Sequence, residues 1–89
     1  MKDTSKYTSR PYPKKVKEKS LFLINDNHNS FDYVVDCLVS LCDHEPIQAE
    51  QCALITHYKG ACNILSGLKS DLELVKDDLI LYGLDVDIV

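Results

Sequence analysis

The sequence predicts an α/β (α+β) two-layer sandwich, in which three helices cover one face of a three-stranded antiparallel sheet in the order βααβαβ. Three observations support this class. Runs typical of strands occur at residues 21–24, 61–65 and 84–89. Apolar residues recur at helical spacing over residues 31–42, 46–58 and 70–82. The chain has 89 residues, which is enough for one small domain with one core.

The first predicted strand is the apolar run Leu-Phe-Leu-Ile at residues 21–24. A short apolar run of this length favours a strand that is buried on the sheet. The string Asn-Asp-Asn-His-Asn follows at residues 25–29, and such side chains satisfy backbone groups in turns. We therefore expect a buried strand that ends in a polar loop.

Two helices are predicted next. Asn29 or Ser30 can cap the first helix, and Asp32 suits the positive charge of its first turn. Pro46 stands where the first residue of the second helix belongs, and Gly60 is a typical C-terminal stop. Several apolar residues of the second helix are small, which permits close packing against its neighbours.

A strand, a helix and a strand complete the predicted order. After Gly60, the run Ala-Cys-Asn-Ile-Leu can form the second strand. Ser70 opens a third helix that reaches Tyr82 and stops at Gly83. Residues 84–89 alternate with period two, which is typical of a strand with one buried face.

The net charge of −4 at pH 7 conceals two parts of opposite sign. Residues 1–19 carry seven cationic side chains against two carboxylates and include two prolines. We therefore expect a flexible basic tail at residues 1–19 and a folded domain at residues 20–89. The second part carries twelve carboxylates against three lysines, which argues against nucleic acid and favours cationic partners.

The sequence has no segment suited to membrane insertion or secretion. Its longest apolar runs, at residues 21–24 and 79–82, are far shorter than the roughly 18 residues of a membrane span. Its basic start leads into no apolar segment of the kind a secretory signal contains. We therefore expect a cytoplasmic protein with no membrane partner.

Four cysteines are present without a C-x-x-C pair: Cys37, Cys42, Cys52 and Cys62. We expect reduced core residues, with a metal or redox site as an alternative. Enzyme motifs such as a glycine-rich phosphate loop are absent, and the chain has three glycines in all. The sequence therefore predicts a non-enzymatic protein that needs no cofactor and no metal.

Three short strings of the sequence and one alanine occur together in a recognisable order. They are Ile-Asn-Asp-Asn at residues 24–27, Phe-Asp-Tyr-Val-Val-Asp-Cys-Leu at residues 31–38, Ala49, and Thr-His-Tyr-Lys-Gly at residues 56–60. This order resembles the ClpS family, the adaptors of Clp proteases. The family has an N-D-D turn, a helix of the type M-E-F-V-x-x-V-L, an alanine in the next helix, and H-x-x-G at its end. Taken singly, these residues fit turn caps and a histidine at a helix end.

The resemblance implies a monomeric N-degron adaptor. Such a protein binds substrates that have a bulky hydrophobic N-terminal residue with a free α-amino group, and it delivers them to a Clp AAA+ unfoldase and its peptidase. The unfoldase would be of the ClpA or ClpC type and would bind through its N-terminal domain. The family also needs a flexible N-terminal extension for delivery, a role that falls on residues 1–19. The alternative is a non-enzymatic interaction or assembly domain of the same fold without degron binding.

The resemblance assigns the α-amino group of the substrate to Asn25, Asp26 and His57. An amide oxygen, a carboxylate and a neutral imidazole nitrogen all accept hydrogen bonds, which an ammonium with three N–H donors requires. The residues it assigns to the hydrophobic pocket come from both predicted helices of the first half: Phe31, Val34, Cys37, Ala53 and Thr56. Without the resemblance, these five residues fit the core of an amphipathic helix pair.

Three of the pocket residues depart from the pattern of the family. Phe31 stands where the family commonly has methionine, and Ala53 where it often has methionine or leucine. Thr56 stands where the family has an apolar residue. These departures predict a pocket whose mouth is more filled and whose wall is more hollow than is common in the family.

Overall fold

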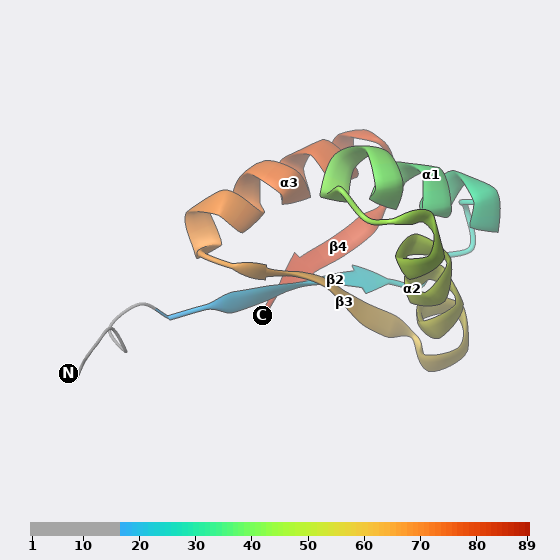
Figure 1. Cartoon of the computed structure of the whole chain (residues 1–89), viewed down its shortest axis with the longest axis horizontal. Helices are drawn as coiled ribbons and strands as arrows, with labels where there is room; N and C mark the ends of the chain where they lie inside the picture. The colour runs from blue at the N-terminus through green and yellow to red at the C-terminus, as the bar shows by residue number, and fades with distance from the viewer. Residues whose placement is uncertain (1–16) are drawn as a thin grey trace, which may run out of the picture.

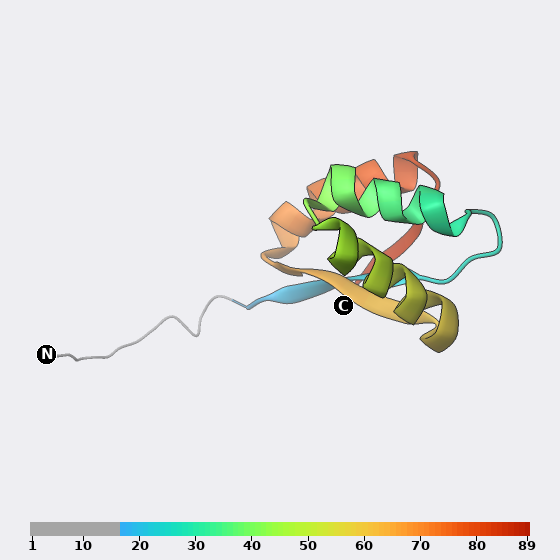
Figure 2. The same ribbon diagram turned by 45° about the vertical axis from the view of Figure 1, so that its right-hand side comes forward.

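The computed structural model describes residues 17–89 and has the predicted order of elements. These are strand β2 (Lys19–Ile24), helices α1 (Phe31–Cys42) and α2 (Pro46–Lys59), strand β3 (Ala61–Gly67), helix α3 (Lys69–Leu81) and strand β4 (Asp85–Ile88). The strands form one antiparallel sheet in the order β3-β2-β4. All three helices lie on the same side of this sheet (Figures 1 and 2). The predicted two-layer sandwich is therefore confirmed.

The predicted basic tail lies almost wholly outside the described residues, which begin at residue 17. The last residue assigned to the tail, Lys19, belongs to β2 and pairs with Gly67 of β3. Both strands extend beyond the apolar runs that predicted them, because pairing with a neighbouring strand sets their ends. Helix α3 likewise begins at Lys69, one residue before the predicted start at Ser70.

The helices are short, and two of them begin where local sequence signals predict. Ser30, one of the two predicted caps of α1, accepts a hydrogen bond at its Oγ from the N–H of Tyr33, 3.1 Å away. Pro46 is the first residue of α2, and Glu45 and Gln48 form a capping box there. Among residues 17–89, no helix has the length and apolar character needed to cross a membrane.

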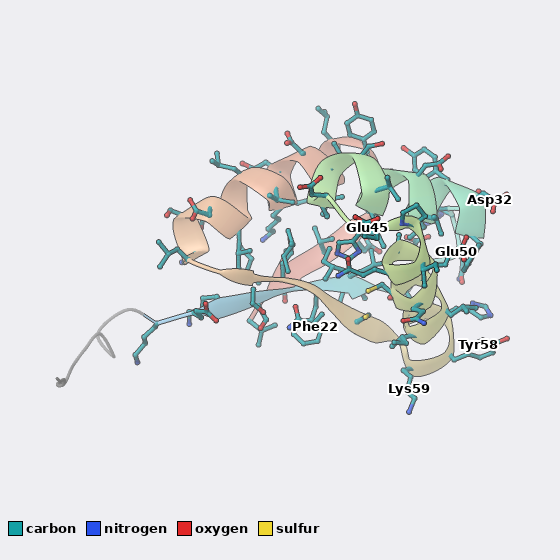
Figure 3. All side chains as sticks on the ribbon, viewed as in Figure 1. Phe22, Asp32, Glu45, Glu50, Tyr58 and Lys59 are labelled. Atoms are coloured by element: carbon teal, nitrogen blue, oxygen red, sulfur yellow. The ribbon has the colours of Figure 1, made fainter. Side chains whose placement is uncertain are left out.

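The core lies between the sheet and the helices. Alternate residues of β2 face opposite sides, so Leu21 and Leu23 are buried, whereas Phe22 points away from the helices (Figure 3). Leu38 of α1 and Leu79 of α3 are fully buried against the same core. The other buried residues of this cluster are Cys37, Cys42, Ala49, Cys52, Ile64, Leu72 and Leu84.

Strand β3 carries a bulge that places one extra side chain in the core. The register shifts between Leu21 and Phe22 of β2, which leaves Ile64 without a partner on that strand. The Ile64 side chain is buried, and its carbonyl oxygen lies 2.8 Å from Nε2 of the buried His44. This contact ties the loop before α2 to β3, so the bulge helps to fix where α2 begins.

Candidate functional site

The loop after β2 is organised around the carboxylate of Asp26. Its Oδ1 accepts hydrogen bonds from the backbone N–H groups of His28 (2.8 Å) and Asn29 (3.0 Å), and its Oδ2 accepts one from Asn29 Nδ2 (3.0 Å). Partial burial raises the pKa of Asp26, but these hydrogen bonds and the charge of His28 together lower it below the ordinary value of 3.8. The carboxylate is therefore ionised at neutral pH.

Asn29 also attaches this loop to the turn that follows α3. Its Nδ2 donates a second hydrogen bond to the carbonyl oxygen of Gly83, 2.9 Å away. Close by, the hydroxyl of Tyr33 donates to the carbonyl oxygen of Tyr82 at 2.6 Å. Because the loop and the first turn of α1 are both bonded to this turn, the position of Asp26 depends on the C-terminal half of the fold as well as on the loop itself.

The end of α2 lies against the same loop. Gly60 caps α2 in a left-handed conformation with φ of 95°, and its N–H donates to the carbonyl oxygen of Thr56 at 2.9 Å. A side chain is strained at this φ, so glycine suits the position. The carbonyl oxygen of Gly60 accepts a hydrogen bond of 2.9 Å from the N–H of Asn25. His57, in the last turn of α2, is thereby held beside the loop.

A pocket of about 480 Å³ opens between this loop and the helices α1 and α2. Asn25, Asp26 and His57 all line the pocket, so the structure brings the three predicted polar residues together. No hydrogen bond within residues 17–89 uses the side chain of Asn25 or His57. Figure 3 shows Asp32, near the start of α1, and Tyr58, near the end of α2, at the same end of the molecule.

Four of the five residues assigned to the hydrophobic pocket line it. Phe31 and Val34 come from α1, and Ala53 and Thr56 come from α2. The fifth, Cys37, does not line the pocket and is buried in the core cluster instead. Cys37 lies one turn further along α1 than Val34, where Cys37 and Leu38 are both buried in the core.

Five lining residues were not among those assigned to the site from the sequence: Leu23, Ile24, Asn27, Asn29 and Leu54. Each of them lies within two positions of a residue that was assigned to the site. Their position next to those residues in the sequence is the signal that could have found them. Leu23 and Ile24 end β2, which brings the end of the central strand to the pocket. Leu54 follows Ala53 on α2 and is 45% exposed, so it stands at the rim.

One known family matches this chain in sequence, and a solved structure matches it in fold. The family model for the ATP-dependent Clp protease adaptor protein ClpS matches residues 14–84, which is most of the chain. The chain belongs to the ClpS family. No curated protein is significantly similar to it in sequence. The structure of Agrobacterium tumefaciens ClpS2 bound to L-phenylalaninamide is similar in fold, with a TM-score of 0.66 and 12% sequence identity over 83% of this chain and 99% of that chain.

The cysteines of this ClpS-family chain are free thiols, and three of them are buried. Burial, together with the charge of Cys37, raises the pKa of Cys42 to about 11. Burial and a hydrogen bond with Cys62 raise the pKa of Cys52 to about 12. In the part of the chain that the structure describes, no group of three or more His, Cys, Asp or Glu side chains is arranged to hold a metal ion.

Proposed function

We propose that the pocket binds the N-terminal residue of N-degron substrates, and that the chain, without catalytic activity of its own, delivers them to a Clp AAA+ unfoldase. The observation that carries this proposal is the position of Asn25, Asp26 and His57 in one pocket whose other wall is largely apolar. The polar side suits an ammonium group, and the apolar side suits a hydrophobic side chain. A bulky hydrophobic residue at a chain terminus has both.

The polar residues retain acceptor positions for a ligand. A carboxylate offers about four such positions, and Asp26 uses three of them within its loop. The Asn25 side-chain oxygen and a neutral His57 ring nitrogen can each accept one more hydrogen bond. An α-ammonium supplies three donors and a positive charge, so its bonds to this group would be charge-assisted. The excess of carboxylates over residues 20–89 adds a longer-range attraction for a cation.

The same group would distinguish a chain terminus from an internal residue. An acetylated or internal residue has one amide N–H and no charge at this position. Acceptors that lose water on binding would then stay unpaired. Such a loss costs about 1 to 3 kcal/mol, which corresponds to a factor of roughly 5 to 150 in affinity.

The comparisons support the two halves of the proposal separately. The description of the family, an ATP-dependent Clp protease adaptor, supports delivery to a Clp protease. An unfoldase of the ClpA or ClpC type is part of the proposal. The ligand of the Agrobacterium tumefaciens protein, L-phenylalaninamide, has a free α-amino group and an aromatic side chain. A ligand of this kind would meet both sides of the pocket. In the proposed mechanism, residues 1–19 are needed to deliver the substrate to the unfoldase and are not needed to bind its N-terminal residue.

Fluorescence anisotropy with two labelled peptides tests capture. The peptides share one sequence that begins with Leu, and one of them is N-acetylated. We expect the acetylated peptide to bind about 5- to 150-fold more weakly. His57→Ala should weaken binding of the free peptide, whereas Gln51→Ala, an exposed residue of α2 outside the pocket, should not. Equal affinities for the two peptides would contradict degron binding and favour an interaction domain of the same fold.

A reconstituted degradation assay tests delivery. A protein that begins with Leu is incubated with the Clp unfoldase and peptidase of the same organism, with and without this chain. We expect the chain to accelerate degradation, and deletion of residues 1–16 to remove the acceleration while peptide affinity stays nearly unchanged. Full acceleration by the shortened chain would contradict a role of these residues in delivery.

A further inference from the structure

Thr56 is the one hydroxyl-bearing residue among those that line the pocket. It lies on α2 three positions after Ala53, so both side chains point from the same face of the helix. Thr56 is 5% exposed and Ala53 is 6% exposed, and both form the pocket wall away from solvent. A side chain that carries a hydroxyl group therefore lines the part of the pocket that is otherwise built from apolar side chains.

The hydrogen-bonding state of this hydroxyl is fixed by its own helix. Thr56 Oγ1 donates to the carbonyl oxygen of Cys52, one turn earlier, over 2.8 Å. A hydroxyl has a single proton, so the bond to Cys52 leaves Oγ1 with lone pairs only. Towards a ligand in the pocket, Thr56 is then an acceptor and not a donor.

The Thr56 hydroxyl costs little binding free energy when the ligand places no hydrogen-bond donor beside it. Oγ1 already takes part in one hydrogen bond, so it is not an unsatisfied buried atom when a purely apolar side chain occupies the pocket. A ligand side chain with an O–H or N–H group gains an additional bond there. Because Ala53 is small, the wall beside Thr56 leaves room for the ring of an aromatic residue.

We propose that Thr56 is a specificity-determining residue, which makes the pocket prefer an aromatic first residue that carries a hydrogen-bond donor, tyrosine, over phenylalanine. This inference rests on the proposed function, because it concerns the side chain of the same bound residue. Phe and Tyr differ by one hydroxyl group, so the preference isolates the contribution of Thr56. A neutral hydrogen bond gained in a partly desolvated pocket corresponds to about a two- to tenfold difference in affinity.

The test compares two peptides that differ only in a first residue of Tyr or Phe, each with a free and an acetylated N-terminus. Anisotropy titrations use the native chain, Thr56→Val and Thr56→Ser. Valine keeps the branched shape without the hydroxyl, and serine keeps the hydroxyl. We expect the native chain and Thr56→Ser to bind the Tyr peptide about two- to tenfold more tightly than the Phe peptide. In Thr56→Val the two affinities should become equal, while binding of the Phe peptide shows that the variant is folded.

The outcomes separate this inference from the proposed function. Equal affinity of the native chain for both free peptides overturns the role of Thr56 and leaves degron binding intact. A preference for Tyr that persists in Thr56→Val overturns it as well. Acetylated peptides that bind as tightly as the free ones, or free peptides that do not bind at all, overturn the proposed function and this inference with it.

Discussion

The backbone N–H of Asn25 donates a hydrogen bond of 2.9 Å to the carbonyl oxygen of Gly60, the residue that caps α2. This bond continues the pairing of β2 with β3 past Ile24 and Ala61, the last pair of the ladder. It joins the polar loop to the end of the helix that carries His57. The fold and the pocket therefore depend on the same local geometry, so substitutions at this junction should affect stability and binding together.

Gly60→Ala is expected to destabilise the fold by about 1 to 2 kcal/mol, because an L-residue is strained in a left-handed conformation. The φ of Gly60 is +95°, and a Cβ at this position would meet nothing within 4 Å. The cost therefore comes from the backbone and not from a clash. Urea denaturation of the native chain and the variant measures it, and peptide affinity should fall in the same variant because the junction with Asn25 is disturbed.

Gly67→Ala is the matched control for backbone strain. Gly67 also has open space where a Cβ would lie, but its φ is not positive. Gly67 is half-buried, and neither strain nor a clash opposes a Cβ there, so the change in its free energy of unfolding should stay within about 0.5 kcal/mol. Similar losses of stability in the two variants would contradict the explanation from backbone strain.

Asp26→Asn is expected to make stability less dependent on acid. Partial burial raises the pKa of Asp26, but the hydrogen bonds of the loop lower it below 3.8 in the folded chain. A group with a lowered folded-state pKa contributes stability that is present above its unfolded-state value and is lost as pH falls through the folded-state value. Between about pH 5 and pH 2, the native chain should therefore lose stability more steeply than the variant. Thermal denaturation across this range measures both slopes.

The control for the acid experiment is Asp77→Asn. Asp77 is exposed on α3, and its carboxylate makes no hydrogen bond within residues 17–89. This variant should follow the native chain across the whole range. If Asp26→Asn also follows the native chain, the loop hydrogen bonds do not stabilise the ionised carboxylate.

Cys62 is expected to react with a thiol reagent much faster than the other three cysteines. Cys37, Cys42 and Cys52 are buried, whereas Cys62 is half-buried at the start of β3. Burial raises the pKa of Cys42 to about 11, and burial with a hydrogen bond donated to Cys62 raises that of Cys52 to about 12, so few of these thiols ionise at pH 8. Ellman's reagent should detect one rapid thiol in the native chain, four in denaturant, and none rapid in Cys62→Ser. Rapid reaction of two or more native thiols would mean that the core opens readily.

Local sequence signals predicted the starts of α1 and α2 and the end of α2, because caps and stops depend on nearby residues, whereas α3 begins after Leu68 without a side-chain cap. Helix α1 is capped by Ser30, and α2 begins at Pro46 and is capped by Gly60, as the sequence predicts. The strand ends were less predictable, since Lys19 belongs to β2 only because Gly67 lies opposite it. The bulge at Ile64 has the same cause, because register is a property of two strands and not of one.

The candidate site was predictable where the resemblance covers the chain, and less so where side chains meet across the fold. The three polar residues share one pocket with four of the five predicted wall residues. Cys37, which the resemblance assigns to the pocket, does not line it and is buried in the core, as its helical spacing alone would predict. Nor does spacing predict that Asn29 would bond to Gly83, a contact between residues 54 positions apart.

Ala53→Trp should remove binding of aromatic peptides without unfolding the chain. Ala53 lines the pocket, so a side chain larger than the methionine or leucine common in the family would occupy the space proposed for the ligand and lower affinity about tenfold or more, while stability changes by less than about 1 kcal/mol. Ala49, one turn earlier on α2, is fully buried in the core and outside the pocket. Ala49→Leu should therefore cost about 1 to 3 kcal/mol of stability by overpacking. Anisotropy and urea denaturation on both variants measure the contrast; undiminished binding by Ala53→Trp would show that the ligand does not enter this pocket.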